Sequence, residues 1–218
     1  MRTFGFPEFL FILEAAKWTL ALSAIAFVGG AILGLIIALM RTSESAWARG
    51  VSTTFIQIFQ GTPLLLQLFL VFFGAPVLGL DINPWVAAGV ALILNSAAFL
   101  GEIWRGCIEA IPRGQWEAAQ ALNLKPWEIF RFVIIKPALK AIYPALTSQF
   151  ILLMLSSAVV SVISADDLTS VAANLQSQTF RSFEIYIVVA AIYLALALAF
   201  SGLFKLIYQR TLNYPDRR

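Results

Sequence analysis

The chain has 218 residues, of which 60% are hydrophobic and 12% are charged, and its mean hydropathy is +0.85. This composition excludes a water-soluble enzyme, because too few polar residues remain to cover a surface in water. With no His and a single Cys, the chain also lacks the residues for a disulfide framework, a zinc site or imidazole catalysis. Neither GxxxxGK(S/T) nor GxGxxG occurs in it, so we expect any nucleotide to bind another chain.

Five runs without charged residues predict five membrane spans, because a charge at mid-bilayer costs about 3 kcal/mol and about 20 apolar residues cross the hydrocarbon. The runs are Trp18 to Met40, Gly50 to Leu80, Ile82 to Gly101, Ala141 to Ala165 and Ile185 to Phe204, which place spans at about 18–40, 51–74, 84–105, 140–164 and 185–207. Charged residues before the first run argue against a cleaved signal peptide. The sequence therefore predicts an all-α integral membrane protein with a single domain over residues 1–218.

The first predicted span carries a stripe of small residues, Ala26, Gly30, Gly34 and Ala38, spaced every four positions. Such spacing places them on one face of a helix, where a second helix can approach closely. We expect this face to pack within the subunit, with a subunit interface as the alternative.

Polar residues inside the second and fourth predicted spans fall on one side of each helix. Gly61-Thr62-Pro63 predicts a kink or unwound turn in the second span. At about 100° per residue, Gln57, Gln60 and Gln67 share one side of that span. In the fourth span, Gln149, Ser156 and Ser164 share a face with Ser157 at its edge. Two interpretations stay open: hydrogen bonds between helices, or a hydrated path for a polar solute.

The segment 106–138 reads as two helices joined by a turn, following an expected i,i+3 ion pair between Glu102 and Arg105. The first helix is predicted over Gln115 to Leu122, behind Pro112 and Gly114, with Glu117 in its first turn. Asn123 ends it, since Asn tolerates the left-handed conformation of a helix stop. A second helix begins near Pro126, and its Trp127, Phe130 and Val133 have the spacing to pack on the membrane-proximal core.

The first of these two helices has a low profile, because Ala118, Ala119 and Ala121 carry only methyl side chains. It is suited to a groove on another protein. An amphipathic helix that lies on the membrane surface is the alternative.

Lys and Arg are distributed unevenly between the segments that alternate across the membrane. One side holds Arg41, Arg49, Arg105, Arg113, Lys125, Arg131, Lys136, Lys140, Lys205, Arg210, Arg217 and Arg218, and the other holds Arg2, Lys17 and Arg181. Because cytoplasmic segments carry the excess of positive charge, we expect the N-terminus outside, the C-terminus inside and the segment 106–138 in the cytoplasm. The net charge of +3 then reflects topology rather than nucleic-acid binding.

The external segment 166–184 is polar. Asp166 is placed to cap a short helix that begins near Leu168. Outside the membrane, neither Asp166 nor Asp167 is expected to need a partner. The segment is expected to be either a solvated loop or a docking surface.

Three stretches of the chain carry a family resemblance. Glu117-Ala118-Ala119 with a helix stop at Asn123 resembles the EAA loop of permease subunits of ABC importers. The segment FQGTPLLLQL at 59–68 resembles the RGTPLLVQL segment of the polar amino acid branch, and residues 102–115 are similar to that branch's sequence before the loop. The chain departs from the family pattern at Asn123, usually Gly, at Gln60, usually Arg, and at Pro137, which comes one residue late.

The resemblance implies a type I importer permease of the bacterial inner membrane, with the N-terminus periplasmic and the C-terminus cytoplasmic. A second permease subunit, identical or different, would complete the pathway, and a periplasmic binding protein would deliver a polar amino acid. The neutral side chains of the pathway do not select between acidic and basic amino acids. A separate ATP-binding subunit would hold ATP and Mg. The ATPase-coupling residues are then Gly114, Glu117, Ala118, Ala119, Leu122 and Asn123. The substrate-pathway residues are Gln57, Gln60, Gln67, Gln149, Ser156 and Ser157. The chain itself is expected to bind no cofactor or metal and to catalyse no reaction.

Two other functions remain as alternatives. A secondary transporter usually shows internal repeats and buried acidic residues, whereas every predicted mid-span here lacks a carboxylate. A membrane assembly protein with no ATPase partner needs neither an inward polar stripe nor a coupling helix. Copurification with an ATPase separates these alternatives from the importer.

Overall fold

The computed structural model of the chain describes residues 5–109 and 113–211, and it describes only the backbone at positions 113, 116, 126, 130 and 134–137. Its helices are α1 (Phe6–Arg41), α2 (Ala46–Gly61), α3 (Leu64–Val77), α4 (Pro84–Glu109), α5 (Arg113–Ala121), α6 (Pro126–Glu128), α7 (Ile135–Ser156), α8 (Leu168–Thr179) and α9 (Ser182–Thr211). A π-helical segment (Ile129–Ile134) precedes α7 and a 3-10 segment (Ser157–Ile163) follows it. The described residues contain no strand, so the predicted all-α class is confirmed.

Four helical stretches are long and apolar enough to span a membrane: α1, α4, 138–163 and α9. The helices α2 and α3 together pass the same test, but they are bent by 106° at the break between Gly61 and Leu64. The kink predicted at Gly61-Thr62-Pro63 is therefore confirmed. Five spans result only if this bent pair counts as one.

The most extensive contact between two helices in the described part of the chain is made by α1 and α4. All four residues of the small stripe, Ala26, Gly30, Gly34 and Ala38, lie on the buried face of α1. A Cβ atom on Gly30 would lie 1.8 Å from Ser96 Oγ, and one on Gly34 would lie 2.9 Å from the backbone nitrogen of Gly101. The two backbones thus approach to a distance that only glycine permits.

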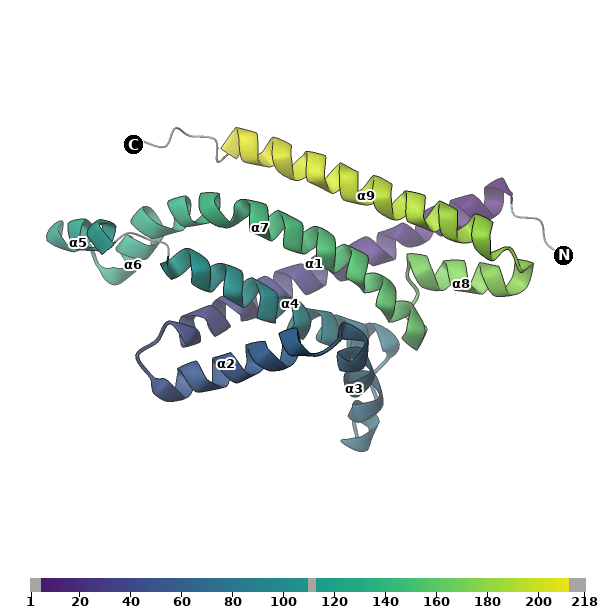
Figure 1. Cartoon of the computed structure of the whole chain (residues 1–218), viewed down its shortest axis with the longest axis horizontal. Coiled ribbons are helices and arrows are strands. Elements are labelled where there is room, and N and C mark those ends of the chain that lie inside the picture. The colour runs from purple at the N-terminus through teal and green to yellow at the C-terminus, as the bar shows by residue number, and fades with distance from the viewer. Residues whose placement is uncertain (1–4, 110–112, 212–218) are drawn as a thin grey trace.

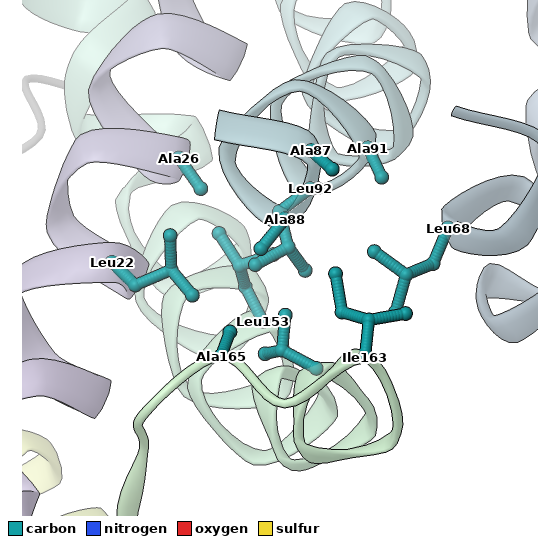
Figure 2. Packing of buried hydrophobic residues seen from close by; sticks show 11 residues of the cluster. Leu22, Ala26, Leu68, Ala87, Ala88, Ala91, Leu92, Leu153, Ile163 and Ala165 are labelled. Atoms are coloured by element: carbon teal, nitrogen blue, oxygen red, sulfur yellow. The ribbon is translucent and has the colours of Figure 1, made fainter. Parts of the chain in front are cut away.

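The main apolar core lies beside this contact and joins four helices. Figure 2 shows how side chains from α1, α3, α4 and α7 meet there with residues from the segment before α8. The labelled members are Leu22, Ala26, Leu68, Ala87, Ala88, Ala91, Leu92, Leu153, Ile163 and Ala165. A second core joins the first half of α1 to α8 and α9. The helix α1 therefore contacts both halves of the structure.

The two ends of the elongated molecule carry different elements. Figure 1 shows α8 and the N-terminus at one end, and α5, α6 and the C-terminal end of α9 at the other. Four residues that support the predicted topology and coupling helix lie outside the described residues: Arg2, Pro112, Arg217 and Arg218.

Three predictions beyond α7 are wrong. The α-helix stops at Ser156, the next segment is 3-10 helical, and Ser164 has φ 59°. A 3-10 helix has about three residues per turn, so Ser164 does not share the face of Gln149. The N-cap of α8 is Asp167 rather than Asp166, and its Oδ1 accepts the Ser170 N–H at 2.7 Å. Asp167 is 1% exposed, so the expectation that it needs no partner is also wrong.

Candidate translocation pathway and coupling segment

The break between α2 and α3 exposes backbone groups that side chains then satisfy. Pro63 supplies no N–H, and Gln67 Nε2 lies 2.8 Å from the Phe59 carbonyl oxygen and 2.9 Å from that of Thr62. The Thr62 hydroxyl donates to the Ile58 carbonyl at 2.7 Å. Asn95 of α4 donates to Gln67 Oε1 at 3.0 Å. An amide pair therefore holds the bend in place.

A cleft of about 290 Å³ lies next to this bend. Its walls come from α2, α3, α4 and α7 and consist of Phe59, Gln60, Thr62, Leu64, Asn95, Phe99, Gln149, Leu152, Leu153 and Ser156. Three of these side chains are amides, and none is charged. The cleft can therefore donate and accept hydrogen bonds without selecting one sign of charge.

The six residues predicted for the substrate pathway divide into three groups. Gln60, Gln149 and Ser156 line the cleft. Gln67 does not line the cleft: it is 4% exposed, and its amide donates to the Phe59 and Thr62 carbonyls at the bend. Gln57 is exposed elsewhere on α2, and Ser157 is buried with its hydroxyl donating to the Met154 carbonyl at 2.7 Å.

The predicted common side of Gln57, Gln60 and Gln67 is wrong, because the 106° bend separates α2 from α3. Helical periodicity does not continue through such a break. Asn95, which contacts Gln67 and lines the cleft, was not among the predicted site residues. Its signal was an amide in the middle of an apolar run, since polar side chains in spans face the protein interior.

The helix α5 is attached to the rest of the protein by one face. Ala119 is 3% exposed and packs in a cluster with Cys107, Ile129, Ala138 and Ile142. The neighbouring coupling residues predicted by resemblance, Gly114, Glu117, Ala118 and Leu122, are exposed. One face of α5 is therefore fixed and the other is open to a partner.

The end of α5 has the geometry predicted for it. Asn123 has φ 54°, which confirms a left-handed stop at this position. The Leu124 N–H donates to the Ala119 carbonyl at 3.3 Å, the bond that closes a Schellman motif. Leu124 also packs on the cluster around Ala119. The turn therefore joins α5 firmly to the segment that follows.

The second helix of this segment differs from its prediction. It begins at Pro126 as expected, but it changes after Glu128 into the π-helical segment. The wider turn of the π-helical segment breaks the 3.6-residue spacing that was expected between Trp127 and Val133. Trp127 is 64% exposed rather than packed on the core. Val133 does pack on the cluster, and the Phe130 side chain lies outside the described part of the structure.

An ion network joins α1 to α4 near this end of the molecule. Arg105 Nη2 lies 2.7 Å from Glu102 Oε2, which confirms the predicted i,i+3 pair. Arg41 at the end of α1 also approaches Glu102, with 3.4 Å between Nε and Oε1. At the end of the α1–α4 contact, the Glu102 carboxylate is therefore shared by Arg41 and Arg105.

Comparison with known proteins decides the family. A model described as the binding-protein-dependent transport system inner membrane component matches residues 30–213. The chain belongs to this family. It is the permease subunit of an ABC importer, and ATP hydrolysis belongs to a separate subunit.

The similar proteins include several amino acid permeases of this family. The glutamine transport system permease protein GlnP of Escherichia coli (strain K12) is 34% identical over 206 residues, 94% of each chain. The probable amino-acid ABC transporter permease protein YckA of Bacillus subtilis (strain 168) is 31% identical, with 87% of this chain and 84% of the relative covered. A crystal structure of an amino acid ABC transporter with histidines aligns with a TM-score of 0.84 and 39% identity, covering 96% of this chain and 100% of the other.

Proposed function

We propose that this permease imports polar amino acids or closely related compounds through the cleft beside the α2–α3 bend. The observation that carries the proposal is the lining of that cleft by amides and a hydroxyl, Gln60, Asn95, Gln149 and Ser156. Such groups hydrogen-bond both the ammonium and the carboxylate of a zwitterion. The names of the similar permeases, which include glutamine transporters, support the same class of substrate.

The proposed orientation places the N-terminus in the periplasm and the C-terminus in the cytoplasm of a bacterial inner membrane. Arg41 is the last residue of α1, Arg105 lies four residues before the end of α4, and Arg210 lies in the last turn of α9. Lys17 lies in the first half of α1, and Arg181 lies between α8 and α9. Figure 1 shows the beginning of α1 and α8 at the opposite end of the molecule from α5. The excess of positive charge supports a cytoplasmic location for the end that carries α5.

Coupling is proposed to run through α5. The exposed Glu117 and Ala118 contact the ATP-binding subunit, which holds ATP and Mg. Ala119 transmits the movement, because it packs on residues of α4 and α7. Gly114 lies at the beginning of α5, and Leu122 and Asn123 lie at its end. A rigid movement of α5 then tilts α4 and α7, which form two walls of the cleft.

The other proposed partners follow from the same orientation. A periplasmic binding protein delivers the substrate at the end that carries α8. A second permease subunit faces the cleft and completes the pathway. The bilayer covers the remaining apolar surface.

The coupling proposal is tested by a bulky substitution at the open face of α5. The variant Ala118→Trp, reconstituted with the ATPase and binding protein, is expected to lose substrate-stimulated ATP hydrolysis and uptake together. The control Gln120→Ala changes another exposed residue of α5 and is expected to keep both. Normal coupling in Ala118→Trp contradicts the proposal.

The substrate proposal is tested in the same vesicles by a screen of amino acids for uptake. Polar amino acids are expected to be carried and apolar ones rejected. Gln149→Leu is expected to raise the substrate concentration needed for half-maximal uptake about tenfold, by removing a polar group from the cleft. Gln57→Leu lies outside the cleft and serves as its control. Equal effects of the two variants contradict the assignment of the cleft.

A further inference from the structure

A second groove lies between α7 and α9, away from the proposed pathway. It has a volume of about 300 Å³ and is lined by residues that include Tyr143, Ser148, Ile151, Ser201 and Lys205. On α7, Ile151 follows Gln149 by two positions, which is about 200° around the helix. The groove therefore faces away from the side of α7 that lines the cleft.

The floor of the groove is fixed by aromatic residues. The Tyr143 hydroxyl donates to the Phe204 carbonyl at 2.9 Å. The rings of Tyr143 and Tyr208 lie 5.5 Å apart between centroids. Deeper along the helices, Phe150 contacts Phe204 with a centroid distance of 5.4 Å. These contacts hold α7 and α9 together behind the groove and leave its outer side open.

The polar groups of the groove are ordered along the helix axes. Lys205 is exposed near the end that carries the positive charges, and the described residues place no carboxylate in an ion pair with it. Ser201 lies one turn deeper on α9, and Ser148 lies at a similar depth on α7. No hydrogen bond within the described chain uses either of these two hydroxyls.

Apolar side chains continue the same face toward the middle of the membrane. Leu198 and Leu194 follow Ser201 along α9 and are 64% and 60% exposed. Ile151 and Leu155 continue the face on α7. From the helix ends inward, the surface therefore presents a cation, then hydroxyls, then a hydrocarbon surface, which is the order of phosphate, glycerol ester and acyl chain in a phospholipid.

We propose that this groove binds an anionic phospholipid of the cytoplasmic leaflet. Lys205 pairs with the phosphate, Ser148 and Ser201 donate to the ester oxygens, and an acyl chain lies along Ile151 and Leu198. Tyr143 and Tyr208 lie at the level of the headgroups, where aromatic side chains of membrane proteins gather. Basic sites between spans on the cytoplasmic side are suited to anionic headgroups. The assignment to this leaflet rests on the orientation in the proposed function.

The test measures phosphatidylglycerol retained by the assembled importer in nanodiscs of phosphatidylcholine with increasing phosphatidylglycerol, by native mass spectrometry. Lys205→Gln is expected to weaken retention about 5-fold, whereas Lys205→Arg keeps it. Arg210→Gln removes a cation near the same end but outside the groove and is expected to have no effect. If Lys205→Gln misfolds, Ser201→Phe fills the groove without touching the charge and is expected to lower retention as well.

Two results overturn the lipid site. One is equal retention of phosphatidylglycerol by the wild type, Lys205→Gln and Ser201→Phe. The other is efficient crosslinking of Ser201→Cys to a second copy in a Cys107→Ala background, which assigns the groove to a subunit interface. A third result separates the two proposals. If lipid is retained but proteolysis maps the Lys205 end to the periplasmic side, the lipid site is supported and the proposed orientation is overturned.

Discussion

The contact between α1 and α4 and the bend between α2 and α3 both lie inside the helix bundle, but they use opposite kinds of side chain. The first relies on the missing side chains of Gly30 and Gly34. The second relies on the amides of Gln67 and Asn95. In lipid, close packing stabilises continuous helices, whereas a broken helix needs side chains for its freed carbonyls. The bend is therefore where polar groups collect and where a polar cleft can form.

The largest expected effect comes from the α1–α4 contact. In Gly34→Ala, the new Cβ lies 2.9 Å from the Gly101 nitrogen and 3.0 Å from the Ala97 carbonyl oxygen. Both are backbone atoms, so the helices must separate, and we expect a loss of about 3 kcal/mol in the free energy of unfolding. An SDS unfolding titration of the purified permease measures it.

The matched control for this variant is Gly202→Ala on α9. A Cβ at Gly202 meets no atom within 4 Å, and alanine favours a helix. Its stability is expected to equal or slightly exceed that of the wild type. A similar loss in both variants means that helix propensity, not close approach, explains the glycines of α1.

The next effect tests the amides at the bend. Gln67→Leu keeps the approximate size of the side chain, but it leaves the Thr62 carbonyl without its donor and the Phe59 carbonyl with only the 3.4 Å contact to Asn95 Nδ2. We expect a loss of about 2 kcal/mol in stability, because buried carbonyls without a partner are costly. The same SDS titration applies, and uptake is expected to fall with it, since the cleft adjoins the bend.

Gln57→Leu is the control for this second prediction, because Gln57 is exposed on α2. It is expected to leave stability unchanged. If Gln67→Leu is equally harmless, the bend is held by the turn residues alone and the contrast with the α1–α4 contact disappears.

The sequence predicted those features of the fold that depend on local spacing. The stripe from Ala26 to Ala38 follows from a repeat of four residues, and the stop at Asn123 follows from the conformational preference of one residue type. The bend at Pro63 was predicted, but its angle depends on contacts with α4 and could not be. The π-helical segment was missed because no local pattern marks a change of helical pitch.

The candidate site was predicted only in part, for a similar reason. Polar residues in spans indicate which side faces the protein interior, and Gln60, Gln149 and Ser156 do line the cleft. The same pattern does not distinguish a cleft-lining amide from one that holds a helix break. For Gln67 that distinction depends on Asn95, which is 28 residues away in the chain.

Asp167 is a buried carboxyl outside the predicted membrane spans. Its burial makes the stability of the protein depend on pH. Burial raises the pKa of its carboxyl to about 6 from 3.8. The folded state thus binds the proton more tightly than the unfolded state, so the contribution of this carboxyl to stability is greatest below pH 3.8 and is lost as the pH rises through about 6. Above that pH the loss is on the order of 3 kcal/mol.

Asp167→Asn keeps an oxygen that accepts the Ser170 N–H and carries no charge. It is expected to remove most of the dependence of stability on pH between 4 and 6, and to stabilise the protein at pH 8. Thermal unfolding followed across this pH range measures both effects. Asp166→Asn, which changes an exposed neighbour, is expected to keep the wild-type profile, and an unchanged profile in Asp167→Asn contradicts the assignment.

The smallest effect is expected from the Ser96 hydroxyl, which forms a hydrogen bond between α4 and α1. Ser96 Oγ donates to the Ala26 carbonyl at 2.9 Å, but that carbonyl lies within α1 and keeps its helical hydrogen bond when the hydroxyl is removed. Ser96→Ala is therefore expected to cost only about 0.6 kcal/mol in the SDS titration. Because Ser96 Oγ is also the atom nearest to a Cβ on Gly30, the double variant with Gly30→Ala should lose less than the sum of the two single variants. A cost for Ser96→Ala as large as that of Gln67→Leu means that the two regions depend on polar bonds alike.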